Sequence, residues 1–557
     1  MTSSSPATPP GAPTRWGPLG GLAWGVLAVA AGLRFWGLDL GLPHLEARPD
    51  ETETLRLTLE AAAGRFDFDW AIYPHAYATL QWAWAEAVLA LGALVQGEPA
   101  PAMSEVWQRE PARLYAIGRG LSAVAGTGTV ALLLGLVRRE LGGRVALVAG
   151  LWLAVNVLHV RESHSLKPDA LLTLGLTACL AATAAMARRP GARSAVVAGV
   201  AVGAAGAMKY NGVLGALPVA VGAWWAAAGQ RGLRRLLPAP LLLAGVCAVA
   251  AFWLFNPFLP FNEEAHDVVL SNLHAVFPEW IDHPAGRAGG APVPIEGPGA
   301  PAWIAAYGAW GALAYHCAFS LWYGVGGIAA LATPIAIVWG FCSRQVLLVA
   351  CAALVVVWFI VTSTSPVALS RYITPALPAL AILQAAGLYA GVQRLGPRRA
   401  GLVLACAAIL LLAQPLVASV RFDALAARTD TRVLAMDWLA ANAVGARVAV
   451  VGTRFWHYGE PRLPAGVRRV PLRSGAPVER SGVDFVVTHD HELFWSSVPS
   501  GFATGRASRL ELLVDFDPRV GGEGVAVFEA NDAFYLPIAG FGGVTLPGPR
   551  VQIYRVR

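Results

Sequence analysis

The chain has 557 residues, of which 56% are hydrophobic and only 14% are charged, and its formal net charge is +7. Its mean hydropathy is +0.53, and apolar runs of about 18 to 25 residues, long enough to cross a bilayer, recur along it. This composition excludes a soluble protein and favours a polytopic α-helical membrane protein, because the strands of a membrane barrel would alternate polar and apolar residues. The positive charge lies in short loops and needs no nucleic-acid partner to explain it.

Residues 1–16 are rich in Ser, Pro and Ala and are predicted to be disordered. The apolar run 17–37 lacks a small-residue cleavage site, so we interpret it as an uncleaved first span and not as a signal peptide. Together with the later runs, it predicts a transmembrane domain at 17–421 with about eleven helices. The later spans are expected near 113–137, 144–160, 168–187, 194–208, 212–228, 236–255, 319–341, 346–362, 369–393 and 400–420.

Basic loops orient these spans, because short loops rich in Lys and Arg stay in the cytoplasm. The arginines that mark such loops are Arg138, Arg139, Arg144, Arg188, Arg189, Arg193, Arg231, Arg234, Arg235, Arg344, Arg394, Arg398 and Arg399. Their alternation requires that the apolar stretch 76–95 does not cross. This stretch contains Gln81, Glu86 and several Trp residues, and these suit a helix in the membrane interface.

Two large external loops are then expected, at 38–112 and at about 256–318, and the odd number of spans places the C-terminal part outside. The composition changes after residue 421. A helical period at 430–443 and short strand patterns at 447–451, 484–488, 525–529 and 551–556 predict a small soluble α/β domain at 422–557. The six cysteines lie in apolar segments without CxxC spacing, which indicates neither disulfides nor a thiolate metal site.

Acidic residues occur where apolar segments begin or end on the expected external side. Asp50 and Glu51 follow the first span, and Asp169 opens a later one. A carboxylate at the membrane surface can act as a general base toward an acceptor hydroxyl. Each acidic position also follows a proline, and acids in a first turn suit the helix dipole, so a purely structural role stays open.

Three cations on the same expected side suggest the substrate. Arg161, Lys209 and Arg371 are suited to hold a phosphate in the plane of the bilayer surface. No phosphate-binding GxxxxGK[ST] loop or dinucleotide glycine pattern is present in the sequence, so a lipid-linked phosphate fits better than a nucleotide. His164 and the other histidines lack tight metal-ligand spacing, which leaves a divalent metal ion open as a cofactor and indicates none with certainty.

Short motifs, in this order along the chain, resemble those of bacterial protein O-mannosyltransferase-like (PMT/ArnT-like) glycosyltransferases, which have the GT-C fold. The resemblance covers roughly residues 33–383. Its motifs are Arg34-Phe35-Trp36, Arg48-Pro49-Asp50-Glu51, Tyr73-Pro74-His75-Ala76-Tyr77, Ser163-His164 through Asp169, Lys209-Tyr210-Asn211-Gly212 and Arg371-Tyr372. Arg48 is a departure, because many relatives have His before the Pro-Asp-Glu.

The resemblance implies a transferase at the external face of a bacterial inner membrane, which uses a polyprenyl-phosphate sugar as donor. Its acceptor is a hydroxyl on a protein, a lipid or a glycan. By this resemblance Asp50 is the catalytic base, with Glu51 beside it, and Asp169 helps to build the site. The residues expected to bind the lipid phosphate and the sugar are Arg161, His164, Lys209, Tyr210, Arg371 and Tyr372.

Two other functions compete with this interpretation. A transporter or a lipid flippase for a phosphate-bearing lipid would show internal repeats and charges deep within broken helices. The chain shows no clear repeat, and its charges lie at one face. An assembly scaffold without catalysis would make Asp50 dispensable. The sequence therefore favours an inverting membrane glycosyltransferase whose sugar and acceptor it does not specify.

Overall fold

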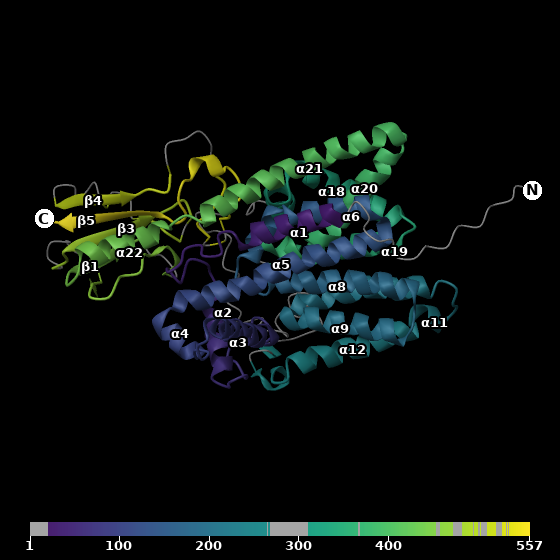
Figure 1. Ribbon diagram of the computed structural model, residues 1–557, viewed down its shortest axis with the longest axis horizontal. Coiled ribbons are helices and arrows are strands. Elements are labelled where there is room, and N and C mark those ends of the chain that lie inside the picture. The colour runs from purple at the N-terminus through teal and green to yellow at the C-terminus, as the bar shows by residue number, and fades with distance from the viewer. Residues whose placement is uncertain are drawn as a thin grey trace, which may run out of the picture.

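The protein consists of a helical domain and a small sheet domain at its C-terminal end, as the computed structural model shows (Figure 1). The structure describes residues 20–263, 266–267, 310–365, 368–452, 457–471, 482–493, 495–498, 502, 509–519, 526–530, 532 and 534–557. The predicted class, a polytopic helical protein with a C-terminal α/β domain, is confirmed. The prediction for residues 1–16 and most of the predicted loop 256–318 lie outside the described residues.

The helical domain begins with α1 (Gly20–Phe35). Its other long helices are α5 (Pro111–Leu141), α6 (Gly143–Ala154), α8 (Asp169–Arg188), α9 (Ala192–Met208), α10 (Ala216–Ala226), α12 (Ala239–Phe255), α18 (Gly327–Cys342), α19 (Val346–Ser363), α20 (Leu377–Gln393) and α21 (Pro397–Ala426). Shorter helical turns connect them: α7 (Val157–Ser163), η2 (Tyr210–Gly215), α11 (Leu233–Leu236), η3 (Leu259–Phe261), α16 (Gly311–Tyr315), η5 (His316–Leu321), α17 (Trp322–Gly324) and η6 (Ser370–Ala376).

Every span predicted from the sequence falls on one helix or on two or three consecutive ones, and the spans at 144–160 and 319–341 are interrupted. The span expected at 144–160 is the pair α6 and α7, which meet at an angle of 59°. The side chain of Asn156 accepts a hydrogen bond from the amide of His159 and so starts a new helix at this bend. The span expected at 319–341 is interrupted at Gly326, whose φ of 102° is favourable only for glycine.

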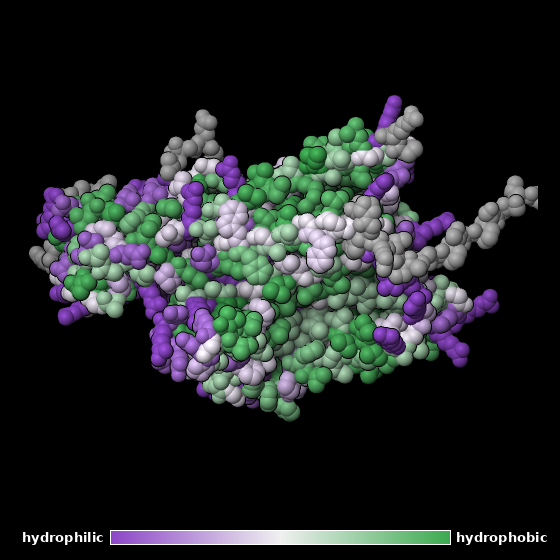
Figure 2. Space-filling view, in the orientation of Figure 1, coloured by the Kyte–Doolittle hydropathy of each residue, from purple (hydrophilic) through white to green (hydrophobic). Residues whose placement is uncertain are grey.

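Six described helices are long and apolar enough to cross a membrane, or seven if the bent pair is one span, and four shorter apolar helices accompany them. Figure 2 shows a broad hydrophobic surface over the helical domain, with hydrophilic residues at both of its ends. Large apolar side chains such as Val246 and Ile335 point outward from this region and are about two-thirds exposed or more. A bundle with such an outer surface is stable in lipid, where these side chains meet acyl chains.

The segment predicted as the first external loop, residues 38–112, contains three helices, α2 (Glu51–Ala62), α3 (Ala76–Gln96) and α4 (Met103–Arg109). α3 is apolar enough to count among the membrane-crossing candidates. In Figure 1, however, it is seen nearly end-on, whereas α5, α8, α9 and α12 run along the long axis of the molecule. This crosswise direction is the one expected for a helix lying in the membrane interface.

The C-terminal domain contains the helix α22 (Thr431–Asn442) and a five-stranded sheet in the order β2-β1-β3-β5-β4. The strands are β1 (Arg447–Val451), β2 (Arg468–Arg469), β3 (Phe485–Asp490), β4 (Leu510–Phe516) and β5 (Arg550–Val556). β1 is parallel to β2 and β3, and β5 is antiparallel to β3 and β4. α22 covers one face of the sheet, where Leu439 packs with Val448 and Ile553. The domain also contains short helical turns at His457–Gly459 (η7) and Phe541–Gly543 (η10).

Three of the four predicted strands and the predicted helix are confirmed, but the strand expected at 525–529 is wrong. Val527 makes only an isolated bridge to Ala539. This stretch belongs to a segment, residues 526–545, that leaves the sheet and packs on the helical domain. Its residues Phe534 and Leu536 are buried in the same apolar core as Trp152 and Trp358. The apolar residues that resemble a strand in the sequence therefore serve to attach the two domains.

Candidate active site

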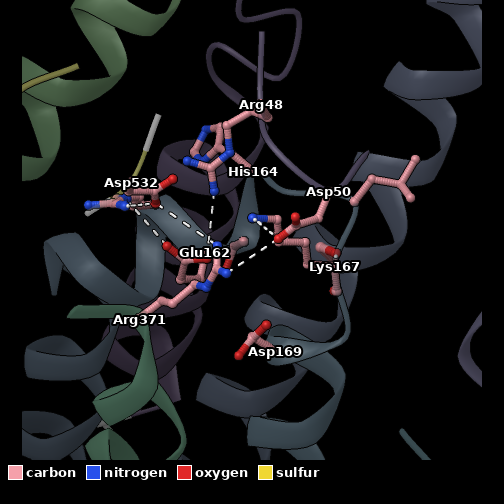
Figure 3. A network of polar contacts seen from close by, with 12 residues as sticks. Arg48, Asp50, Glu162, His164, Lys167, Asp169, Arg371 and Asp532 are labelled. Carbon is pink, nitrogen blue, oxygen red and sulfur yellow. Dashed lines mark hydrogen bonds and ion pairs between the residues drawn. The ribbon is translucent and has the colours of Figure 1, made fainter. Parts of the chain in front are cut away.

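The site lies where the helical domain meets segment 526–545 of the C-terminal domain (Figure 3). Asp50 stands at the start of α2, and Lys167 precedes α8. Arg371 lies in η6, and Asp532 comes from the C-terminal domain. Figure 3 shows these side chains converging, with Asp169 below them. Residues separated by hundreds of positions therefore form one polar network inside an apolar protein.

Asp50 has a left-handed backbone, which is uncommon for a residue other than glycine. Its φ is 68°, and it is the only non-glycine residue with a positive φ in the described ranges. This left-handed conformation costs a non-glycine residue about 1–3 kcal/mol and is typical of functional sites. The adjacent α2 helps to hold it, because the amide of Thr54 donates a hydrogen bond to the Asp50 carbonyl. The strained turn directs the carboxylate toward the polar network.

Two cations contact the same oxygen of the Asp50 carboxylate. Lys167 Nζ lies 3.2 Å and an Arg371 guanidinium nitrogen 3.3 Å from Asp50 Oδ2. The positive charge of Lys167, and to a smaller extent that of Arg371, holds the pKa of Asp50 well below its usual range, although burial opposes this shift. No hydrogen bond to Oδ1 is found among the described residues, and the Asp50 side chain is 35% exposed. Asp50 therefore carries a charged carboxylate with one oxygen that a substrate can reach.

The neighbouring Glu51 lies in the opposite environment. Its side chain has no exposed surface and forms an ion pair with Arg119 at 2.7 Å. Its other oxygen accepts a hydrogen bond from the amide of Leu166. Glu51 therefore connects α5 with the turn that precedes α8. This placement indicates that Glu51 positions Lys167 and Asp169 and does not itself contact a substrate.

Asp169 is the first residue of α8, where a carboxylate is favourable to the helix dipole. Its Oδ1 lies 3.0 Å from Lys209 Nζ, while its buried Oδ2 has no hydrogen bond within the described part of the chain. Lys209 also lies over the rings of Tyr73 and Tyr372, 5.2 and 5.7 Å from their centroids. Burial disfavours the charge on Lys209, but Asp169 and Tyr73 outweigh it and raise the pKa of Lys209 above its usual range.

Arg161 and Arg371 are joined through carboxylates of the C-terminal domain. Arg161 makes ion pairs of 2.8 Å with both Glu529 and Asp532. Asp532 lies 4.0 Å from Arg371. Burial disfavours the charge on Asp532, but Arg371 and then Arg161 outweigh it and lower its pKa. Glu529 also accepts hydrogen bonds from the amide and hydroxyl of Ser370, so the C-terminal domain fixes the residue that precedes Arg371.

Several buried donors at the site make no hydrogen bond in the described part of the chain. These are Arg371 Nε, Lys167 Nζ and all three guanidinium nitrogens of Arg48. Arg48 stacks on the ring of Phe534, 4.0 Å from its centroid, and lies 3.6 Å from Glu162. Unsatisfied buried donors are costly, at about 1–3 kcal/mol each. Their concentration here indicates a capacity to bind an anion.

The remaining predicted residues lie around this network. His164 lies between the carbonyls of Val160 and Trp36, 2.8 Å from each. Tyr210 donates a hydrogen bond to the carbonyl of Ala71 and so attaches the segment 38–112 to η2. Tyr372 faces Lys209 and accepts a hydrogen bond from Trp358 through its own carbonyl. These contacts give His164 and Tyr210 structural roles and leave the ring of Tyr372 near the site.

Sequence reasoning placed Lys167 only within the charged cluster from Arg161 to Asp169, without a role of its own, and did not select Glu529 or Asp532. Lys167 had a signal, because it lies two positions before Asp169 in a short polar connection between apolar runs. Glu529 and Asp532 had none, because no motif links them to the helical domain. For a metal ion, the described residues contain no group of three or more His, Cys, Asp or Glu side chains with suitable geometry.

The chain was also compared with known proteins. The family model of dolichyl-phosphate-mannose-protein mannosyltransferase matches residues 117–261. No curated protein matches the sequence. Among solved structures, ArnT from Cupriavidus metallidurans in the apo state has 16% identity, covers 96% of this chain and 98% of its own, and has a TM-score of 0.49.

Two further structures show similarity at lower scores. The Archaeoglobus fulgidus oligosaccharyltransferase tethered with an acceptor peptide has 11% identity over 89% of this chain and 72% of its own, with a TM-score of 0.47. An S. cerevisiae protein O-mannosyltransferase complex bound to the sugar donor has 19% identity over 44% of this chain and 35% of its own, with a TM-score of 0.34. The family match confirms the resemblance to protein O-mannosyltransferase-like glycosyltransferases over residues 117–261, which include Arg161, Asp169 and Lys209.

Proposed function

We propose that this protein is an inverting membrane glycosyltransferase, which moves a sugar from a polyprenyl-phosphate donor to an acceptor hydroxyl at the external face of a bacterial inner membrane. The observation that carries the proposal is the environment of Asp50. This carboxylate is held in a strained turn, is partly exposed, and lies within 3.3 Å of two cations that can bind a phosphate. A base next to an anion site is the arrangement that sugar transfer from a lipid phosphate requires.

Asp50 supplies the base in this mechanism. Its Oδ1 accepts the proton of the acceptor hydroxyl while the hydroxyl oxygen attacks the anomeric carbon of the sugar. The bond between that carbon and the phosphate oxygen breaks on the opposite side, and the electron pair leaves with the polyprenyl phosphate. One displacement of this kind inverts the configuration at the anomeric carbon.

The leaving phosphate needs positive charge, because its negative charge grows as the bond breaks. Arg371 and Lys167 already face Asp50, and Lys209 lies close by at Asp169. When the phosphate binds Arg371 and Lys167, these cations stabilise Asp50 less. The pKa of Asp50 then rises toward its ordinary value, and the carboxylate becomes a stronger base. Donor binding and activation of the base are coupled in this way through shared cations.

The basic loops support the proposed orientation. Arg188 forms an ion pair with Glu140, so the ends of α5 and α8 that carry basic residues lie side by side. Figure 1 shows α11, with its two arginines, at the same end of the helical domain, opposite to the C-terminal domain. By the positive-inside rule this end faces the cytoplasm. The site and the C-terminal domain then lie outside.

A transporter for the same lipid would also bind a phosphate but would form no new bond. The decisive experiment uses purified protein in detergent, a labelled polyprenyl-phosphate sugar and a pool of membrane and cell-wall acceptors. We expect labelled glycan and released polyprenyl phosphate, and neither with Asp50→Asn. Donor binding without release of polyprenyl phosphate, across the whole acceptor pool, would support the transporter and contradict the transferase.

A further inference from the structure

The ion pairs of the site form a continuous chain across the domain boundary. Arg48 pairs with Glu162, which contacts Arg161, and Arg161 holds Glu529 and Asp532. Asp532 faces Arg371, and Asp50 lies between Arg371 and Lys167. The four cations of this chain, Arg48, Arg161, Lys167 and Arg371, are matched by four carboxylates, Asp50, Glu162, Glu529 and Asp532.

This balance conflicts with the binding of an anionic lipid. A phosphate that enters a buried cluster of zero net charge adds negative charge without a free cation to receive it. Burial of an unpaired charge is costly, so one carboxylate has to leave the cations or lose its charge when the phosphate binds. The question is which of the four carboxylates the phosphate replaces.

Three of the four carboxylates are fixed or needed. Glu529 is held by Arg161, Ser370 and Tyr315. Glu162 lies on α7 within the helical domain, and Asp50 is the proposed base. Asp532 is the carboxylate that the two arginines share, because it lies 2.8 Å from Arg161, the single hydrogen-bond partner of its side chain in the described residues, and 4.0 Å from Arg371. It also belongs to the other domain and to no helix or strand.

We propose that Asp532, which lies between Arg161 and Arg371, is the anion that the lipid phosphate replaces at Arg371. This inference rests on the proposed function, because it takes Arg371 as a phosphate ligand. In the donor-free protein Asp532 keeps the two arginines apart and compensates their charge. When the phosphate arrives, Asp532 withdraws, and when polyprenyl phosphate has formed, Asp532 competes with it and speeds its release. The C-terminal domain thereby takes part in the exchange of the lipid.

The test measures binding of polyprenyl phosphate, which is itself the leaving group, to full-length protein in detergent. Asp532→Asn removes the competing charge and keeps the size, so we expect about tenfold tighter binding. Asp532→Glu keeps the charge and should bind as the native protein does. Asp515→Asn is the matched control, because Asp515 lies in β4 and pairs with Arg550 far from the network. Equal or weaker binding by Asp532→Asn overturns the inference.

Arg371→Ala separates this inference from the proposed function. If Arg371→Ala weakens binding and Asp532→Asn does not strengthen it, only the exchange is wrong. If Arg371→Ala leaves binding unchanged, the phosphate site is wrong, and the exchange falls with it.

A second measurement on the native protein does not depend on the folding of a variant. The amide of Asp532 donates a hydrogen bond to the carbonyl of Glu529. We expect hydrogen exchange of the peptide around Asp532 to become faster when polyprenyl phosphate binds, whereas unchanged or slower exchange contradicts a withdrawal of Asp532.

Discussion

Arg371 divides the site into two halves that differ in exposure and in origin. On one side, Asp50 is 35% exposed, has a strained backbone and belongs to the predicted first external loop. On the other side, Arg161, Glu529 and Asp532 are at most 4% exposed, and two of them come from the C-terminal domain. A base must meet its substrate, whereas a buried ion pair fixes positions. The comparison assigns proton transfer to the open half and charge compensation at the domain boundary to the closed half.

The largest effect is expected at the base. Asp50→Asn keeps the size of the side chain but removes the proton acceptor, so turnover should fall by about 10² to 10⁴. Donor binding should not weaken, because Arg371 and Lys167 lose a competing carboxylate. Turnover and donor affinity are measured separately on the purified protein. Asp69→Asn is the control from the same loop, since Asp69 pairs only with Arg56 among the described residues. Native turnover in Asp50→Asn would contradict the assignment of Asp50 as the base.

Substitutions in the closed half should lower the free energy of unfolding. Glu529→Gln leaves Arg161 with less compensating charge in a buried place, which costs about 3–5 kcal/mol. The control is Glu511→Gln in β4, because Glu511 forms an exposed pair with Arg557 that is worth about 1 kcal/mol at most. Thermal unfolding in detergent compares the two variants. A similar loss in both would show that Glu529 does not connect the domains.

Arg371, which both halves share, should affect the affinity for the lipid-linked donor. Arg371→Ala should weaken binding of polyprenyl-phosphate sugar by about 1.5–3 kcal/mol, the range for hydrogen bonds to charged groups. Arg371→Lys should recover only part of this, because lysine keeps the charge but loses the planar fork. Arg394→Ala is the control, since Arg394 directly follows the other end of α20. Equal affinity in Arg371→Ala and Arg394→Ala would remove Arg371 from the phosphate site.

The smallest effect is expected in the pH dependence. Lys167 and Arg371 lower the pKa of Asp50, so its carboxylate stays charged as the pH falls through the ordinary range of aspartate. The contribution of this charge to activity is therefore present above that range and is lost only at lower pH. Lys167→Met removes the largest cause of the shift, and the acid limb of kcat/KM should move to higher pH. If the acid limb of kcat/KM does not move, a group other than Asp50 determines its pH.

The residues of the open half have a signal in the sequence, because they lie next to apolar runs. An acidic pair after the first span and Arg371 before a later one are visible as charges at the ends of helices. Two neighbours could not be told apart in this way. Asp50 and Glu51 are both acids at a helix start, yet one is exposed to substrate and the other is buried on Arg119. Which side chain turns inward depends on the left-handed backbone of Asp50, and no sequence pattern specifies that conformation.

Hydrophobicity and loop charge act locally along the chain, so the membrane class, the helical segments and the gathering of charges at one end of the bundle can be predicted from the residues alone. The entry of the C-terminal domain into the site cannot, because it depends on how the two domains pack. Glu529 ends the stretch that resembles a strand and Asp532 follows it, more than 150 residues after Arg371 and still farther from Arg161. Their role depends on long-range ion pairs between separately formed domains, and such pairs leave no period or spacing in the sequence.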